Sequence, residues 1–111
     1  MIDDRLQALV GGHCYANAAP ADAPVPRLVF VLVDDDRGFV LAGLDGTSTV
    51  RVQVDAWARN SVAAAALSLR VFDAMAAPGA DFDTTAAQRL PGDHDTATQL
   101  HCARWEFTLE P

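Results

Sequence analysis

The sequence contains no lysine, and its eight cations are all arginines spread singly along 111 residues. Fifteen acidic residues outweigh them, which leaves a formal net charge of -7 at pH 7. Proteins that bind nucleic acids or anionic membranes by charge carry a basic patch, and this chain has none. We therefore expect no direct sequence-specific binding of nucleic acid and no binding to a membrane.

Cysteine is also scarce, since Cys14 and Cys102 are the only two. Two cysteines do not make a disulfide framework. Apolar runs such as Val62 to Leu67 are too short to cross a bilayer. The opening Met1-Ile2-Asp3-Asp4 is acidic, whereas a secretory signal peptide begins with basic residues. We expect one soluble domain, residues 1-111, that works in a reducing cytoplasm with free thiols.

Residues 49 to 58 alternate with a period of two, which predicts a strand of an antiparallel sheet with one dry face. The dry side carries Val50, Val52, Val54 and Ala56. The other side combines a cation, an amide, a carboxylate and an indole, namely Arg51, Gln53, Asp55 and Trp57. Such a mixture is more typical of a subunit contact than of free surface.

A helix is predicted from residue 61 to 77, opened by Asn60-Ser61 and ended by Pro78-Gly79. It has two apolar stripes, of which one should face the sheet and the other a partner. The wider stripe consists of Val62, Ala65, Ala66, Leu69, Phe72 and Ala76. The narrower one consists of Leu67, Val71 and Met75. We assign the narrower stripe to a partner, with coverage by another part of the same chain as the alternative.

The remaining pattern predicts short elements around these two. We expect a short helix over 2-10 stopped by Gly11-Gly12, an extended segment over 13-16, and strands over 27-33, 39-43, 82-90 and 98-109. The strands between residues 27 and 58 should form a meander with a hairpin turn at Asp45-Gly46, and residues 91 to 95 a turn. In the last strand one face should carry Trp105, Phe107 and Leu109, and the wetter face Arg104, Glu106 and Thr108. The predicted fold is α+β, with an antiparallel sheet of four to five strands packed against one long and one short helix.

None of the possible chemical motifs is complete. His13-Cys14 and His101-Cys102 supply zinc-type ligands, but neighbours in an extended chain point to opposite faces. His94 lies between Asp93 and Asp95, yet neither cysteine has the context of a nucleophile. Asp34-Asp35-Asp36 lacks the spacing of a calcium loop and predicts a solvated turn. We expect no catalytic residue, no metal and no cofactor.

The order of the segments resembles a known family. The opening Arg5-Leu6-Gln7-Ala8-Leu9-Val10-Gly11-Gly12 is followed by Tyr15-Ala16-Asn17 and by the proline-rich residues 19 to 24. A hydrophobic strand comes next, and then residues 50 to 58 with the helix behind them. This arrangement resembles the tail completion, or tail terminator, proteins of long-tailed bacteriophages and prophages, over residues 5 to 77 and the final strand.

The resemblance implies a non-enzymatic α+β subunit that forms a homo-oligomeric ring, commonly a hexamer. Such a ring would cap the tail tube in the virion tail or neck and join it to the head connector protein, after assembly in the bacterial host cytoplasm. Its contacts would be Arg51, Gln53, Asp55 and Trp57, with the narrower helix stripe as the apolar partner. The acidic turn from Asp34 to Arg37 would reach a neighbour or the tail-tube protein.

Two other functions stay open at this point. A head-tail connector, or neck adaptor, would join the portal side instead of the tube. A small metal-binding or thiol enzyme would need Cys102 or His101 in a functional pocket. The ring number, the face that meets each partner and the residues lining the lumen do not follow from the sequence.

Overall fold

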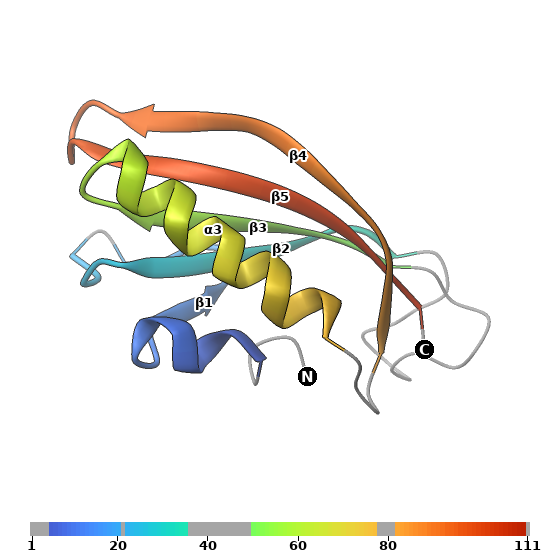
Figure 1. Ribbon diagram of the computed structural model, residues 1–111. Helices are drawn as coiled ribbons and strands as arrows, with labels where there is room; N and C mark the ends of the chain where they lie inside the picture. Colours follow the sequence, from blue (N-terminus) through green and yellow to red (C-terminus); the bar gives the residue numbers. More distant parts are fainter. Residues whose placement is uncertain (1–4, 21, 36–49, 78–81, 111) are drawn as a thin grey trace.

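The computed structural model describes residues 5-20, 22-35, 50-77 and 82-110, which form a curved sheet with one long helix across it (Figure 1). The α+β class predicted from the sequence is confirmed. Among the described residues the elements, in chain order, are the 3-10 helix η1 (Gln7-Val10), β1 (Cys14-Ala16), β2 (Arg27-Asp35), β3 (Val50-Ala58), α3 (Ser61-Ala76), β4 (Asp83-Asp95) and β5 (Leu100-Glu110).

The sheet has the strand order β1-β2-β3-β5-β4. Strand β1 runs parallel to β2 and the other neighbours are antiparallel, so the sheet is mixed and not antiparallel throughout as predicted. The meander expected between residues 27 and 58 is wrong, because β2 pairs directly with β3. The strand and hairpin turn expected between them, 39-43 and Asp45-Gly46, lie outside the described residues. Of the short helix expected over 2-10, residues 2-4 lie outside the described residues, residues 5-6 are α-helical, and Gln7-Val10 form the 3-10 helix η1, which Gly11 ends with a φ of 61°.

Helix α3 begins where the sequence predicts, because the side chain of Asn60 accepts a hydrogen bond from the backbone N-H of Ala63 at 2.8 Å. Its buried face is the narrower stripe: Leu67, Val71 and Met75 are at most 1% exposed. The assignment of these three residues to a partner contact is therefore corrected to the protein core. The outward residues of α3 include Val62 and Leu69, which are 77% and 58% exposed.

A polar residue in the middle of the buried stripe explains why the sequence pattern assigns the wrong face of α3 to the core. Ser68 is fully buried, and its hydroxyl donates to the carbonyl of Ala65 at 2.7 Å. Because the helix itself satisfies the hydroxyl, Ser68 can face the sheet together with Leu67 and Val71. The core that results joins α3 and η1 to one face of the sheet, through Leu6, Val10, Leu28, Val50, Val52, Val54, Phe82, Phe107 and Leu109.

The C-terminal hairpin is longer than the sequence predicts. Strand β4 continues through Pro91 to Asp95, so the turn expected over 91-95 is wrong. The strand absorbs the proline through a register shift between Leu90 and Asp93, and a second shift lies between Thr84 and Ala86. On β5 the predicted alternation is confirmed, since Phe107 and Leu109 are buried against the helix side.

Arg5 fastens the N-terminal segment to the end of α3. Its guanidinium lies 4.0 Å from the centre of the Phe82 ring. It donates hydrogen bonds of 2.8 to 3.3 Å to the backbone carbonyls of Ala74, Met75, Ala77 and Phe82. The last carbonyls of a helix have no partner within the helix, and a cation there also interacts favourably with the negative end of the helix dipole.

Candidate interaction surface

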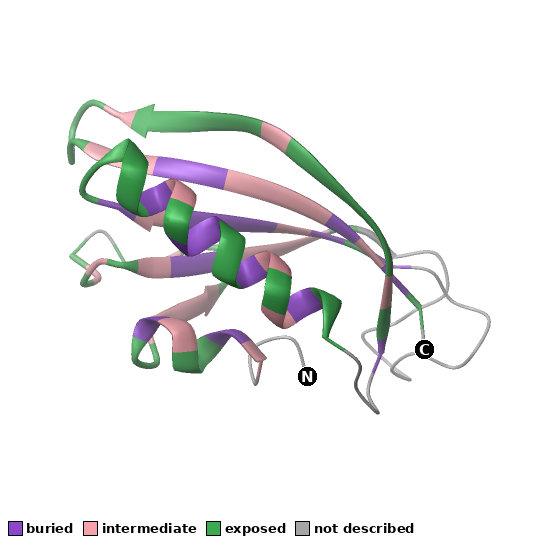
Figure 2. Cartoon of the chain, in the orientation of Figure 1, coloured by how far each residue is buried: buried purple, intermediate pink, exposed green. Residues whose placement is uncertain are grey.

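In the part of the chain that the structure describes, the helices cover one face of the sheet and no helix covers the other (Figure 2). We call the uncovered side the open face. Strands β3 and β5 form its centre, with Asp55 opposite Arg104, Gln53 opposite Glu106, and Trp57 opposite Cys102. The alternation of β3 thus places all four residues predicted for a subunit contact on the open face, together with side chains from β5.

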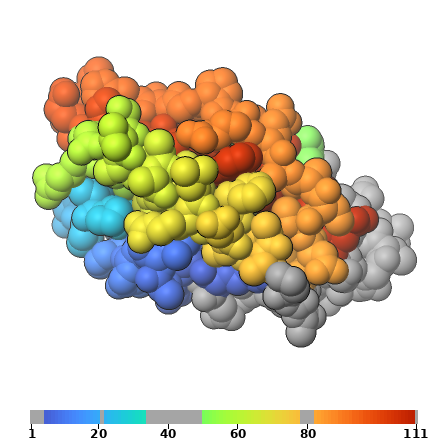
Figure 3. Space-filling model, in the orientation of Figure 1, coloured from blue at the N-terminus to red at the C-terminus, as the bar shows by residue number. Residues whose placement is uncertain are grey.

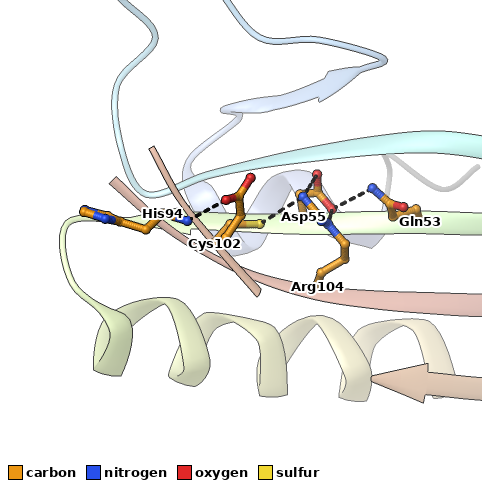
Figure 4. Close-up of polar contacts among 6 residues, drawn as sticks. Gln53, Asp55, His94, Cys102 and Arg104 are labelled. Atoms are coloured by element: carbon orange, nitrogen blue, oxygen red, sulfur yellow. Dashed lines mark hydrogen bonds and ion pairs between the residues drawn. The ribbon is translucent and has the colours of Figure 1, made fainter. Parts of the chain in front are cut away.

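A bidentate ion pair organises the open face. Arg104 donates from Nε to Oδ1 of Asp55 at 2.8 Å and from Nη2 to Oδ2 at 3.3 Å (Figure 4). Gln53 also donates to Oδ1 of Asp55, at 3.1 Å. With these donors around it, Asp55 is only 8% exposed on a face that no helix covers. The hydrogen bond to Asp55 raises the pKa of Arg104 above its ordinary value.

Arg51 and Trp57 are more accessible than Asp55. The side chain of Arg51 is 46% exposed and lies 3.5 Å from the carboxylate of Glu106. Trp57 is half-buried at the other end of the same row. Indole and guanidinium groups are enriched in protein interfaces. Among the four predicted contacts, these two can therefore reach a partner. Gln53 and Asp55 instead belong to the hydrogen-bonded group that fixes the side chain of Arg104.

The alternation of the last strand predicts Arg104 and Glu106 on its wetter face but does not mark them as site residues. Their importance depends on the pairing of β5 with β3, which no local pattern reveals. An arginine and an aspartate on two alternating strands are the available signal, but the register decides whether they meet.

Cys102 is poorly suited to act as a nucleophile. Burial, together with the charge of Asp55, raises the pKa of its thiol to about 12, although Arg104 acts in the opposite direction. The thiol therefore stays protonated near neutral pH, whereas a nucleophilic cysteine reacts as the thiolate. Both cysteines are free thiols, as the sequence predicts.

The two His-Cys pairs are far apart in the sheet, because β2 and β3 lie between β1 and β5. His94 is not in a loop but on β4, directly opposite His101, and the two rings stack with their centres 4.4 Å apart. They line a cavity of about 630 Å³ beside the first turns of α3, together with Arg89, Asp93 and Ser61. Within the described residues, no group of three or more possible metal ligands is found.

The acidic segment predicted to reach a neighbour is described only in part. The backbone of Asp34 and Asp35 belongs to the end of β2, opposite Arg51 and Val50, so β2 continues into the segment predicted to be a turn. Asp36 and Arg37 lie outside the described residues. Contact between this segment and a partner stays a prediction.

Comparisons with known proteins bear on the fold and on the family. A chain of the virion of a native gene transfer agent particle matches with a TM-score of 0.50 and 19% identity, covering 96% of this chain and 84% of that chain. At this identity the match shows the fold. No curated protein matches the sequence, and no helix in the described part of the chain has the length and apolar character to span a membrane. The family model for tail completion protein gp17 matches residues 1-108, and the chain therefore belongs to this family of structural phage proteins.

Proposed function

We propose that the chain is a tail terminator subunit. Copies of it close into a ring, commonly a hexamer, at the end of the tail tube, and the ring joins the tube to the head connector. Family membership over residues 1-108 supports a structural role in virion assembly. The ring and the two partners are the further steps of the proposal.

The open face is the observation that carries the proposal. A sheet that packs against a helix on one side alone leaves its second face available for a neighbour. Here that face carries a half-buried tryptophan beside an ordered ion pair. Residues of this kind are common at subunit contacts and do not constitute a catalytic centre.

In this proposal Arg51 and Trp57 contact the next subunit, while Gln53 and Asp55 keep Arg104 in place beneath the contact. Closure requires a heterologous contact, in which one surface of a subunit meets a different surface of the next. The net charge of -7 is compatible with passage of DNA through the ring, because a lumen without positive charge would not hold the phosphates.

The test is binding of purified protein to tail tubes that lack their terminator, with electron microscopy and sedimentation as readouts. We expect the wild type to form rings on the tube ends. Arg51→Glu should abolish ring formation, because it reverses an exposed charge on the open face. Arg70→Glu is the matched control, since it makes the same change on an exposed position of α3.

Rings formed equally well by both variants would exclude the open face as the contact. A wild-type protein that ignores tubes but binds the portal side would favour the neck adaptor instead. Pull-down against isolated tail-tube protein and against portal-side proteins separates these outcomes.

A further inference from the structure

Two histidines face each other near the tip of the β4-β5 hairpin. His94 is directly opposite His101, in the last but one pair before the turn. Residues directly opposite on neighbouring strands lie on the same face of a sheet. For the histidines this is the helix side, because His101 is two residues from Ala103, which packs with Ala64 of α3. Each of the two strands therefore supplies one imidazole to the same side of the hairpin.

The space beside the two imidazoles can hold a hydrated ion. His94 and His101 line the cavity of about 630 Å³ between the hairpin and the first turns of α3. In the space-filling view the start of α3 lies against this end of the hairpin (Figure 3). His94 is exposed and His101 is half-buried. A water molecule occupies about 30 Å³ in the liquid, so the cavity has room for an ion together with waters of its own.

The two rings are free to act as ligands. They stack with their centres 4.4 Å apart and their planes 24° apart. Within the described residues neither imidazole takes part in a hydrogen bond or an ion pair. A neutral imidazole has one ring nitrogen with a free lone pair, and it is the commonest protein ligand of transition metals. The pair therefore offers two nitrogen ligands side by side.

The charged groups near the pair partly cancel. Asp93 and Asp95 flank His94 in the strand. Arg89 lines the same cavity, but its guanidinium lies over the ring of Trp105, 5.5 Å from the ring centre. The N-terminal end of α3 adds a partial positive charge. Because imidazole is a neutral ligand, the affinity for an ion depends mainly on the two metal-nitrogen bonds.

We propose that His94 and His101 chelate a divalent transition-metal ion at the tip of the hairpin, with water in the remaining coordination positions. Bonds of about 2.0 to 2.1 Å place two nitrogens of one ion about 3 Å apart. Rings whose centres are 4.4 Å apart reach this separation when their edges tilt together. The site goes beyond the proposed function and does not depend on the ring.

The ligands come from two strands, which removes the objection that the sequence raises. Neighbours such as His101 and Cys102 point to opposite faces, so a His-Cys pair cannot easily chelate one ion. Strand pairing instead joins one histidine of β4 to one of β5. Nitrogen ligands favour Ni²⁺, Cu²⁺ and Zn²⁺ over Mg²⁺ and Ca²⁺, which prefer oxygen. A bound ion would link the two strands and stabilise the tip of the hairpin.

Titration of the full chain with Zn²⁺, Ni²⁺ and Mg²⁺ tests the proposal, with calorimetry in a non-chelating buffer as the readout. We expect one Zn²⁺ or Ni²⁺ ion per chain and no uptake of Mg²⁺. His94→Ala and His101→Ala should each weaken binding by at least tenfold, because one imidazole alone cannot chelate. His13→Ala is the matched control and should leave binding unchanged, since His13 precedes β1 at the other end of the sheet.

A thermal measurement separates chelation from a structural role of the histidines. At a free Zn²⁺ concentration about 100 times its dissociation constant, the melting temperature of the wild type should rise by at least about 5 °C. His94→Ala and His101→Ala should keep a folded circular dichroism spectrum and show no such rise. A purely structural role would change the melting temperature without the ion and leave the rise intact.

Spectroscopy of the wild type needs no variant. Paramagnetic Ni²⁺ should broaden the imidazole NMR signals of His94 and His101 and spare those of His13. With Co²⁺ in place of Zn²⁺, the absorption spectrum should lack a sulfur-to-metal band, because Cys102 lies on the open face.

No uptake of Zn²⁺ or Ni²⁺ by the folded wild type would overturn the proposal. Equal affinity of the wild type and either histidine variant would do so as well, since the ion would then lie elsewhere. A sulfur-to-metal band from Co²⁺, or loss of binding in His13→Ala, would place the ion at a cysteine or at the other His-Cys pair and would also refute it.

Discussion

At the scale of single residues, the notable feature is a charged pair on a sheet face without a covering helix. Asp55 is almost inaccessible because Arg104 and Gln53 surround its carboxylate. The pair is held in one geometry by two hydrogen bonds, which distinguishes it from the longer pair formed by Arg51 and Glu106. Such a fixed pair shapes the surface that a partner would meet.

We expect Asp55→Asn to lower the free energy of unfolding by about 1 to 3 kcal/mol, because Arg104 loses its ionic partner in a partly buried place. Arg51→Gln is the control and should cost less than about 1 kcal/mol, since that pair is exposed to solvent. Urea unfolding followed by circular dichroism measures both values. Equal effects of the two substitutions would show that the Asp55 pair has no special role.

Cys102 provides a pH-dependent test. Its pKa in the folded protein is about 12, against an ordinary value of 9.0. The folded state therefore holds the thiol proton more tightly, and the contribution to stability is complete below pH 9 and is lost as the pH rises toward 12. We expect the stability of the wild type relative to Cys102→Ala to be constant up to about pH 8 and to fall above pH 9.

The same shift predicts slow reaction of native Cys102 with a disulfide reagent at pH 8, and fast reaction after denaturation. Mass spectrometry of the labelled peptides distinguishes Cys102 from Cys14. Rapid labelling of Cys102 in the native protein, or a stability difference that does not change with pH, would contradict the assigned burial of the thiol.

At the scale of elements, α3 is fixed at both ends by side chains from different parts of the sequence. Asn60 satisfies the first turn locally. Arg5 satisfies the last turn from the other end of the chain, and Thr84 adds a 2.6 Å hydrogen bond to the carbonyl of Met75. The helix cap is visible in the sequence, whereas the contribution of Arg5 depends on the tertiary fold.

These two ends should contribute unequally. Asn60→Ala should destabilise the protein by about 1 kcal/mol through loss of the cap. Arg5→Met should cost more, above about 2 kcal/mol, because hydrogen bonds from a charged donor are each worth about 1.5 to 3 kcal/mol. Ser61→Ala, at an exposed neighbour of Asn60, is the control. Thermal unfolding ranks the three variants, and a smaller effect of Arg5→Met than of Asn60→Ala would contradict this account.

The elements that the sequence predicts best are those with a strict period and a clear boundary. Strand β3, α3 and the alternation of β5 follow from spacing alone. The buried side of α3 does not, because Ser68 interrupts the stripe and its hydroxyl is satisfied inside the helix. The length of β4 was not predictable either, since Pro91 and Gly92 are typical of turns. The turn lies after Asp95, and this position brings His94 opposite His101.

At the scale of the whole molecule, the strand order is the part that local patterns cannot supply. The chain inserts β5 between β3 and β4 and adds β1 parallel to β2 at the far end. Both choices depend on contacts between distant segments. The sequence therefore predicts only part of the open face. The alternation of β3 predicts which of its residues lie there, but the β5 residues opposite them follow only from the strand register.

The sheet also has a direction. It ends in the three-residue strand β1 on one side and in the 13-residue strand β4 on the other. A closed circle made from objects with a distinct head and tail has no twofold axis in its plane, so its upper and lower rims differ. Such an assembly exposes a different surface on each rim, and a single gene product would then provide two dissimilar docking platforms.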